Sequence, residues 1–323
     1  MSLQELRQAM VNIRQASKSW VTLYGMEMSP SFHFTGGEPI LRRDLFSILA
    51  HARHLGFSVS LLSNGVSITP DIARKIASVG VQDVQVSIDG LEEVHDGIRG
   101  EGSFKAAWQG IDNLLARGVD TNINLTVSRV NLTQIEGVVK LAAERGVSAV
   151  ALSRLVPCGR GREMADQMLT PAELAGLYGG LSGLKQSSGI VVTSRDPLAS
   201  IPDMTGEVPD AAFPIGGCAA GVFGVTICSD GSIMPCRRMD LSIGNIKTDY
   251  FRKLWAESPV LWSLRRRQGY HDGCRSCVYW PVCRGCRAVA LAYARSQGRE
   301  DCLGADPQCP YRRSHETAVA AES

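Results

Sequence analysis

The segment Asp83-Val84-Gln85-Val86-Ser87-Ile88 decides the fold class, because apolar and polar residues alternate along it without a break. Alternation with a period of two is typical of a strand that buries only one of its faces. Asn122–Val127 repeats the pattern, and so does Ser31–Thr35 with its two phenylalanines. These segments therefore predict strands that have one apolar and one polar face.

Longer helical stretches separate the predicted strands. The five strands expected are Ser31–Thr35, Phe57–Leu62, Asp83–Ile88, Asn122–Val127 and Ala149–Ser153. The helices expected are residues 2–17, 43–55, 70–79, 104–117, 133–145 and 170–183. Regular alternation of strands and helices predicts a parallel sheet with helices outside it. A sheet covered on both faces has nearly continuous apolar strands, so the polar face favours a barrel with a ligand cavity over a half-exposed sheet.

The composition is that of a globular protein, with 44% hydrophobic and 20% charged residues among 323. The net charge of +2 gives no reason to expect a nucleic-acid or membrane partner. The first ten residues do not form a signal peptide, and no apolar run reaches membrane-spanning length. We therefore expect a cytoplasmic protein, in which ten cysteines favour metal ligands over disulfides.

Most of the cysteines lie in the last third of the chain. The segment Cys274–Cys286 reads C-x2-C-x5-C-x2-C, and C-x12-G-x4-C joins Cys218 to Cys236. Thiolates at such spacing bind zinc or an iron–sulfur cluster. Because Cys302 and Cys309 follow downstream, the set exceeds what one four-ligand site needs. The pattern predicts two metal sites with interleaved ligands.

Four short motifs follow the predicted strands in a fixed order. They are FTGGEP at Phe34–Pro39, LLSNG at Leu61–Gly65, SIDG at Ser87–Gly90 and H-x3-R at His95–Arg99. In this order they resemble the motifs of radical S-adenosylmethionine (SAM) enzymes. The cysteine-rich region resembles the SPASM-type auxiliary cluster domain that many of these enzymes carry. The resemblance covers nearly the whole chain and implies a partial (β/α)6 barrel that lacks its first strand.

The resemblance implies a SAM site at the ends of the strands. The segment matched to the one that receives the methionyl ammonium is Gly36, Gly37, Glu38 and Pro39. Ser63 and Asn64 match ribose contacts. Ser87 and Arg99 match the positions that hold the SAM carboxylate, a task that suits the fixed fork of donors in arginine. Asp89 either contacts the ribose or caps its own turn.

The resemblance also assigns the cysteines to two auxiliary clusters. The ligands matched to the outer cluster are Cys274, Cys277, Cys283 and Cys309. Those matched to the inner cluster are Cys218, Cys236 and Cys286. Cys302 is the alternative to Cys309, and the fourth inner ligand is either Cys228 or an open position on the iron. Zinc is the alternative to iron and sulfur for the whole region, and Cys158 is expected to be a packed thiol.

The implied organisation has four parts. They are a partial barrel over 1–187, a linker over 188–217, a SPASM-like iron–sulfur domain over 218–311 and a flexible tail over 312–323. The C-x3-C-x2-C loop that holds the SAM-cleaving cluster in this family is not in the sequence, whose first cysteine is Cys158. Either the sequence is truncated at an internal Met1 or the chain has lost radical chemistry. The intact SAM-side motifs favour truncation.

The function implied is that of an oxidoreductase-type maturase, which acts on a peptide or cofactor precursor through a 5′-deoxyadenosyl radical. Its cofactors would be SAM and two auxiliary 4Fe-4S clusters, with a SAM-cleaving 4Fe-4S cluster in a full-length form and a low-potential reductant such as flavodoxin or ferredoxin as partner. A peptide substrate is favoured. Arg237 occupies the position at which sulfatase-maturing enzymes carry an Asp that serves as a base. This difference disfavours sulfatase maturation. The alternative is a non-catalytic iron–sulfur electron-transfer protein, and no catalytic residue is identified.

Overall fold

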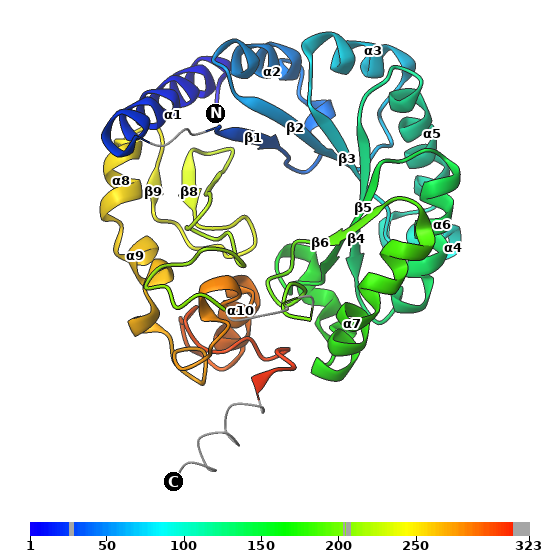
Figure 1. Cartoon of the computed structure of the whole chain (residues 1–323). Coiled ribbons are helices and arrows are strands. Elements are labelled where there is room, and N and C mark those ends of the chain that lie inside the picture. The colour runs from blue at the N-terminus through cyan, green and yellow to red at the C-terminus, as the bar shows by residue number, and fades with distance from the viewer. Residues whose placement is uncertain (26–28, 203, 205–207, 313–323) are drawn as a thin grey trace. The chain divides into compact units, whose positions relative to one another are not determined.

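The computed structural model describes residues 1–25, 29–202, 204 and 208–312 (Figure 1). Within these residues, six strands form one sheet in the order in which they follow along the chain. The strands are β1 (Ser31–Phe34), β2 (Ser58–Ser63), β3 (Asp83–Ser87), β4 (Thr121–Val127), β5 (Ala149–Arg154) and β6 (Val191–Ser194). Neighbouring strands from β1 to β4 run parallel. The expected α/β class is confirmed.

Helices connect successive strands, and Figure 1 shows α2, α3, α5 and α6 on the outer side of β1 to β4. Their bounds are α1 (Leu3–Tyr24), α2 (Leu45–His54), α3 (Pro70–Val79), α4 (Glu92–Arg99), α5 (Ser103–Leu115), α6 (Ile135–Glu144) and α7 (Pro171–Ser188). The predicted helix over 70–79 coincides with α3, whose N-cap Thr69 accepts a hydrogen bond from Ile72 N–H and whose C-cap Gly80 is left-handed.

Two expectations about the helices are corrected. The first helix runs to Tyr24, beyond the predicted end at residue 17, and closes at a left-handed Gly25. The helix α4 is not among the predicted helices, because it contains only eight residues.

The strand faces have the polarity that the sequence predicts. Val84 and Val86 on β3 pair in register with Thr121 and Ile123 on β4, and both valines are fully buried. On the opposite face the Gln85 side-chain amide donates to Asn122 Oδ1 at 2.9 Å. The apolar face thus packs under the helices, and polar side chains pair with one another on the other face.

The chain divides into two compact units. The first comprises Met1–Leu152, Leu184–Thr193 and Ile246–Arg252, and the second comprises Ser153–Gly183, Ser194–Asn245 and Lys253–Ser323, described to residue 312. The stretch 188–217, expected to be a linker, contains β6, and residues 203 and 205–207 of it lie outside the described residues. The predicted tail over 312–323 lies outside them from residue 313 onward.

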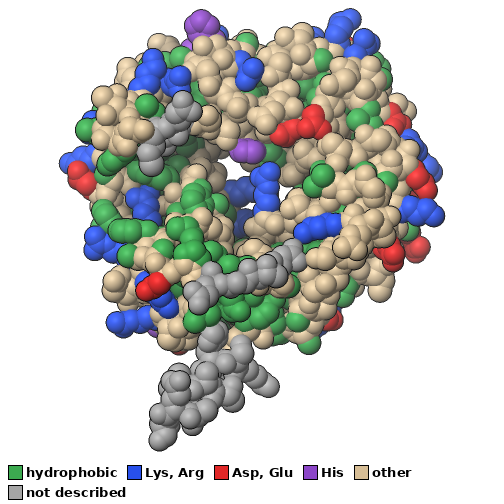
Figure 2. Space-filling view, viewed as in Figure 1, with side chains coloured by type: hydrophobic (Ala, Val, Ile, Leu, Met, Phe, Trp, Pro, Cys, Tyr) green, Lys and Arg blue, Asp and Glu red, His purple; other side chains and the backbone are tan. Residues whose placement is uncertain are grey.

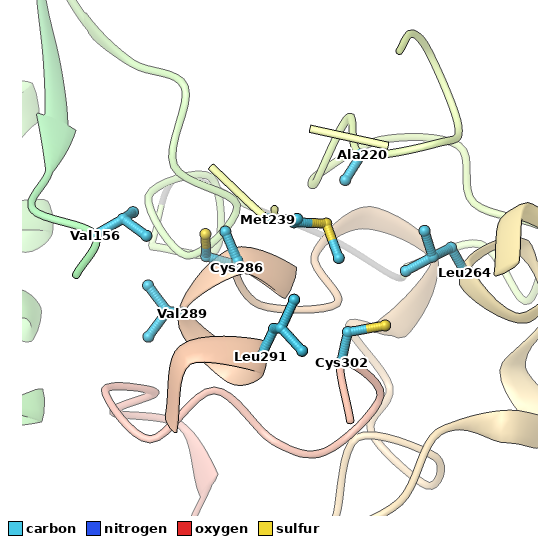
Figure 3. Close-up of a cluster of buried hydrophobic side chains, with 9 residues drawn as sticks. Val156, Ala220, Met239, Leu264, Cys286, Val289, Leu291 and Cys302 are labelled. Carbon is cyan, nitrogen blue, oxygen red and sulfur yellow. The ribbon is translucent and has the colours of Figure 1, made fainter. Parts of the chain in front are cut away.

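The cysteine-rich region is built from short elements. A three-stranded antiparallel sheet holds β7 (Thr226–Ile227), β8 (Ser232–Met234) and β9 (Gly244–Asn245). The helices that follow are α8 (Phe251–Glu257), α9 (Pro259–Arg265) and α10 (Arg287–Ser296). The second unit has a core of its own, in which Cys286 and Cys302 pack with Met239, Leu264 and Leu291 (Figure 3).

No helix among the described residues combines the length and apolar character needed to cross a membrane. On the face shown in Figure 2, Lys and Arg side chains are interspersed with Asp and Glu, as the net charge of +2 leads one to expect.

Candidate functional site

Glu38 joins the ends of the first two strands. It caps the short 3-10 turn Pro39–Leu41 by accepting from Ile40 N–H at 3.2 Å. The same carboxylate accepts from the Ser63 hydroxyl and from Asn64 N–H, both at 2.8 Å. Because β1 and β2 are parallel neighbours, their carboxyl ends lie at one edge of the sheet. The structure therefore brings together three of the residues predicted to contact SAM.

Gly36 and Gly37 precede this carboxylate and are exposed. Neither has a positive φ, and a Cβ added to either would meet no atom within 4 Å. Packing within the described part of the protein therefore does not require glycine here. Glycine at both positions leaves the backbone open to close approach by a ligand, which fits the predicted contact with the methionyl ammonium.

Asp89 is the centre of a second polar group at the same edge. Its side chain is 5% exposed and accepts from Arg99 Nε at 2.6 Å and from Thr126 N–H at 2.8 Å. The Asp89 N–H donates to His95 Nδ1 at 3.1 Å. Burial above all, with the nearby Arg99 charge, lowers the pKa of His95. The neutral imidazole is thus an acceptor that fixes the Asp89 turn.

Asn131 completes this group, and sequence reasoning missed it. It is fully buried, and its amide donates to Asp89 O at 2.8 Å and to Thr126 O at 2.9 Å. Its Oδ1 accepts from Ser128 N–H at 2.8 Å. The available signal was its place just beyond the predicted strand 122–127, where polar side chains from parallel strands converge. Ser87, by contrast, was predicted, and it lies on β3 in register with Asn124 of β4.

Four cysteines form the outer thiol group. Burial is the main cause that raises the pKa of Cys283, and the nearby thiols of Cys309 and Cys277 raise it further. Burial, with Asp306, Cys274 and Cys277, raises the pKa of Cys309 to about 11. The thiols of Cys274, Cys277 and Cys309 thus act electrostatically on one another or on Cys283, and these four residues are the ligands predicted for the outer cluster.

Cys218 lies at the centre of the inner thiol group. Burial raises the pKa of Cys286 to about 12. The Arg154 charge lowers this pKa, and the Cys218 thiol raises it further. Burial also raises the pKa of Cys236 and of Cys302, and Cys218 contributes to both. Cys302 and Cys286 lie in one apolar core, against which Cys218 and Cys236 pack. Figure 3 shows Cys286 and Cys302 in the apolar core of this unit.

The two remaining thiols lie in different surroundings. Cys228 is in the hairpin that joins β7 to β8, with its sulfur 3.8 Å from the sulfur of Met234. Cys158 packs against the same apolar core as the inner thiols. Burial lowers the pKa of Arg237, and the nearby thiols of Cys236 and Cys158 partly offset this shift.

The segment from Cys283 to Cys286 is a tight loop with two successive left-handed residues. Arg284 and Gly285 both have positive φ, at 64° and 60°. Gly285 N–H already donates to the sulfur of Cys283 at 3.2 Å. The loop thus provides a donor for a buried thiolate.

Buried guanidinium groups surround the thiols. Arg154, Arg284 and Arg287 are each 2% exposed or less, and Arg284 donates to the carbonyl of Cys218. Buried charges need opposite charges nearby, and a cluster held by four thiolates is anionic. Among the described residues, no three His, Cys, Asp or Glu side chains converge as one metal ion would require. In a four-iron cluster each thiolate binds a different iron, so such a cluster does not require three side chains to converge on one ion.

Comparisons with known proteins agree with this geometry. Residues 20–142 match the radical SAM superfamily, and residues 218–278 match the SPASM iron–sulfur cluster-binding domain. An AdoMet-dependent heme synthase from Methanosarcina barkeri is 32% identical over 88% of this chain and 83% of its own. The mycofactocin maturase MftC from Mycolicibacterium smegmatis is 33% identical over 85% of this chain and 69% of its own.

One solved structure shows the fold clearly. Native anSMEcpe with bound AdoMet and Cp18Cys peptide superposes with a TM-score of 0.70 at 22% identity, over 99% of this chain and 90% of that chain. The motifs, the sheet and the thiol groups lead to one conclusion: this chain belongs to the radical SAM superfamily and carries a SPASM iron–sulfur cluster-binding domain.

Proposed function

We propose that this protein is a radical SAM/SPASM maturase that modifies a peptide or a cofactor precursor by way of a 5′-deoxyadenosyl radical. The observation that carries the proposal is that one chain combines the polar edge around Glu38 and Asp89 with two groups of buried or half-buried free thiols. When bound to a reduced four-iron cluster, SAM supplies a radical that abstracts hydrogen from a substrate. The residues of the polar edge bind and orient SAM.

Most of the predicted SAM contacts have a role in this proposal. The open backbone at Gly36 and Gly37 and the carboxylate of Glu38 take the ammonium, which needs acceptors. Ser63 and Asn64 face the ribose. Arg99 uses Nε for Asp89, and the rest of its fork is suited to the carboxylate of SAM. The buried pairing of Asp89 with Arg99 favours the second interpretation of Asp89, in which it fixes its own turn.

The auxiliary clusters are assigned to the thiol groups. Cys274, Cys277, Cys283 and Cys309 would hold the outer one, and Cys218, Cys236 and Cys286 the inner one. These clusters would remove an electron from the substrate radical or bind the substrate directly. The electron for SAM would come from a low-potential donor such as flavodoxin or ferredoxin.

Metal content and SAM binding test this proposal. The chain, reconstituted without oxygen, should bind about eight irons if two four-iron clusters form, and equilibrium dialysis should detect one bound SAM per chain. The C-x3-C-x2-C ligands of a SAM-cleaving cluster are not among the 323 residues, so this test measures binding and not turnover. Zinc at about two per chain with little iron would contradict the cluster assignment. Full iron content without SAM binding would favour the non-catalytic electron-transfer protein.

The substrate proposed is a peptide. The relative named mycofactocin maturase and the similar fold that was solved with a peptide support it. A tetrapyrrole is the second candidate, because the relative named AdoMet-dependent heme synthase matches a larger share of its own length. Haem is a suitable probe for the difference. A saturable shift of the haem Soret band at one site per chain would favour the tetrapyrrole, and no shift would favour the peptide.

A further inference from the structure

Arg287 has two buried donors that no described residue satisfies. It is the first residue of α10, directly after Cys286, and its side chain is among the most deeply buried in the chain, at 1% exposure. Nη1 donates to Cys302 O at 2.9 Å and to Gly304 O at 2.8 Å. Nε and Nη2 have no hydrogen-bond partner within the described residues. Leaving buried donors of a charged group unpaired is costly, so a native protein rarely does so without a reason.

The side chain is held in one place beside cysteine residues. Its guanidinium carbon lies 5.1 Å from the ring centroid of Tyr270, a stacking distance suited to arginine. Arg287 directly follows Cys286 in the chain and donates to the carbonyl of Cys302, and both of these cysteines lie in the apolar core of this unit.

The neighbouring carboxylate does not satisfy the two free donors. Asp306 Oδ1 accepts from Arg154 Nη1 at 3.1 Å and from Gln308 N–H at 3.0 Å. Its Oδ2 accepts from Arg154 Nη2 and from Cys286 N–H. All of its contacts are thus made with groups other than Arg287.

The space around Nη2 is also preserved by glycine. A Cβ added to Gly285, which has a φ of +60°, would lie 2.9 Å from Nη2 of Arg287. Such a contact would push the guanidinium away from its position. The loop that carries Cys283 and Cys286 therefore leaves room for these donors beside the thiols.

We propose that Arg287 is a positioning residue for the auxiliary iron–sulfur clusters, and that its Nε–H and Nη2–H donate hydrogen bonds to cluster sulfur and so raise a cluster's reduction potential. Cluster sulfur is an anionic acceptor of the kind that two buried cationic donors lack. Hydrogen bonds to sulfur and nearby positive charge both stabilise the reduced cluster, which carries one more negative charge. This inference rests on the iron–sulfur part of the proposed function.

The test is a potentiometric titration of the reconstituted protein, followed by electron paramagnetic resonance. In Arg287→Met, at least one auxiliary cluster should be harder to reduce by tenfold or more in its one-electron equilibrium, which corresponds to about 59 mV. Arg287→Lys keeps the charge and loses the fork, so its shift should be smaller. The matched control is Arg265→Met. Arg265 also has a buried unpartnered Nη2, but burial is the cause of its lowered pKa, with no thiol involved.

Each outcome decides the question. Unchanged potentials in Arg287→Met, or an equal shift in Arg265→Met, would overturn the inference. If both Arg287 variants lose iron while their metal-free circular dichroism matches that of the wild type, the fork is needed to hold a cluster and the inference stands. Loss of iron together with loss of the metal-free fold would show that Arg287 serves folding alone. Wild-type protein that binds no iron would instead contradict the proposed function.

Discussion

Cys286 N–H donates to Oδ2 of Asp306 at 2.8 Å, so a predicted cluster ligand is held by a carboxylate twenty residues farther along the chain. Asp306 is 1% exposed. Burial by itself would raise its pKa, but the Arg154 guanidinium and the N–H groups of Cys286 and Gln308 lower it. Arg154 also pairs with Asp196. The position of Cys286 therefore depends on an ionised and fully buried carboxylate.

Replacing Asp306 by Asn should destabilise the protein strongly. The amide keeps the volume of the side chain, but it removes one of the two carboxylates that pair with Arg154 and leaves one acceptor oxygen for the buried donors of Arg154, Cys286 and Gln308. Because Asp196 still pairs with Arg154, the loss should stay below the cost of about 3–5 kcal/mol for a buried charge left alone. Unsatisfied buried donors cost about 1–3 kcal/mol, and we expect a loss of that size in the free energy of unfolding measured with urea. The exposed pair of Arg145 with Asp112 provides the control, since Asp112→Asn should cost at most about 1 kcal/mol. Equal effects of the two substitutions would show that the buried pair contributes little.

Stability should fall as the pH falls through the range in which free histidine titrates. His95 is buried and has a pKa below its usual value in the folded state, so the unfolded chain binds a proton first. The contribution of His95 to the free energy of unfolding is complete above a pH of about 6.5. It is lost as the pH falls, by at most about 1.4 kcal/mol per pH unit. His95→Asn should flatten the difference in unfolding free energy between pH 7.5 and pH 5. The exposed His54 is the control, and an unchanged pH dependence in His95→Asn would contradict this assignment.

Gly110 should not tolerate a methyl group. A Cβ added there would lie 2.2 Å from the carbonyl oxygen of Gly65, a backbone atom at the end of β2 that cannot move alone. Overpacking of this kind costs about 1–3 kcal/mol. Gly110→Ala should therefore lower the free energy of unfolding by an amount in this range or larger. Gly97 lies in α4 with nothing within 4 Å of its added Cβ. Gly97→Ala should therefore stabilise the protein, by about 0.5–1 kcal/mol, and a loss in that variant would contradict the packing argument.

Glu38→Gln should weaken SAM binding more than it weakens the fold. The amide retains one acceptor oxygen, so it keeps part of the contact with Ser63 and Asn64 but removes the negative charge proposed to face the ammonium. A lost charge–charge contact of about 1.4 kcal/mol lowers affinity tenfold, and we expect at least this change in dialysis with labelled SAM. The exposed Glu101 is the control for a loss of charge on the same unit. Unchanged affinity in Glu38→Gln would remove Glu38 from the SAM site.

Local patterns in the sequence predicted one part of the fold and long-range contacts determined the rest. Alternation over Asp83–Ile88 identified β3, because its period is contained in a few residues. The residues of β6 read Val-Val-Thr-Ser and do not alternate between apolar and polar. The contact of Arg154 with Asp306 spans 152 residues, and nothing in the neighbouring sequence of either residue indicates it.

The site divides in the same way. Glu38, Asp89 and the paired cysteines belong to motifs with fixed spacing, and the sequence therefore singles them out as candidates. Asn131 and Arg287 lie outside those motifs. Each acquires its importance from burial beside groups that come from elsewhere in the chain, which is a property of the folded chain alone.

The two late cysteines should give different results when they are replaced. The thiols of Cys274 and Cys277 act electrostatically on Cys309, whereas Cys302 lies in the apolar core against which Cys218 packs. Cys309→Ser should therefore remove the outer cluster, so that reconstituted iron falls from about eight to about four per chain. Cys302→Ser should leave the outer cluster intact, with its electron paramagnetic resonance signal unchanged. The opposite result, in which Cys302→Ser abolishes the outer signal and Cys309→Ser does not, would make Cys302 the closing ligand and would require the segment 302–309 to rearrange when a cluster binds.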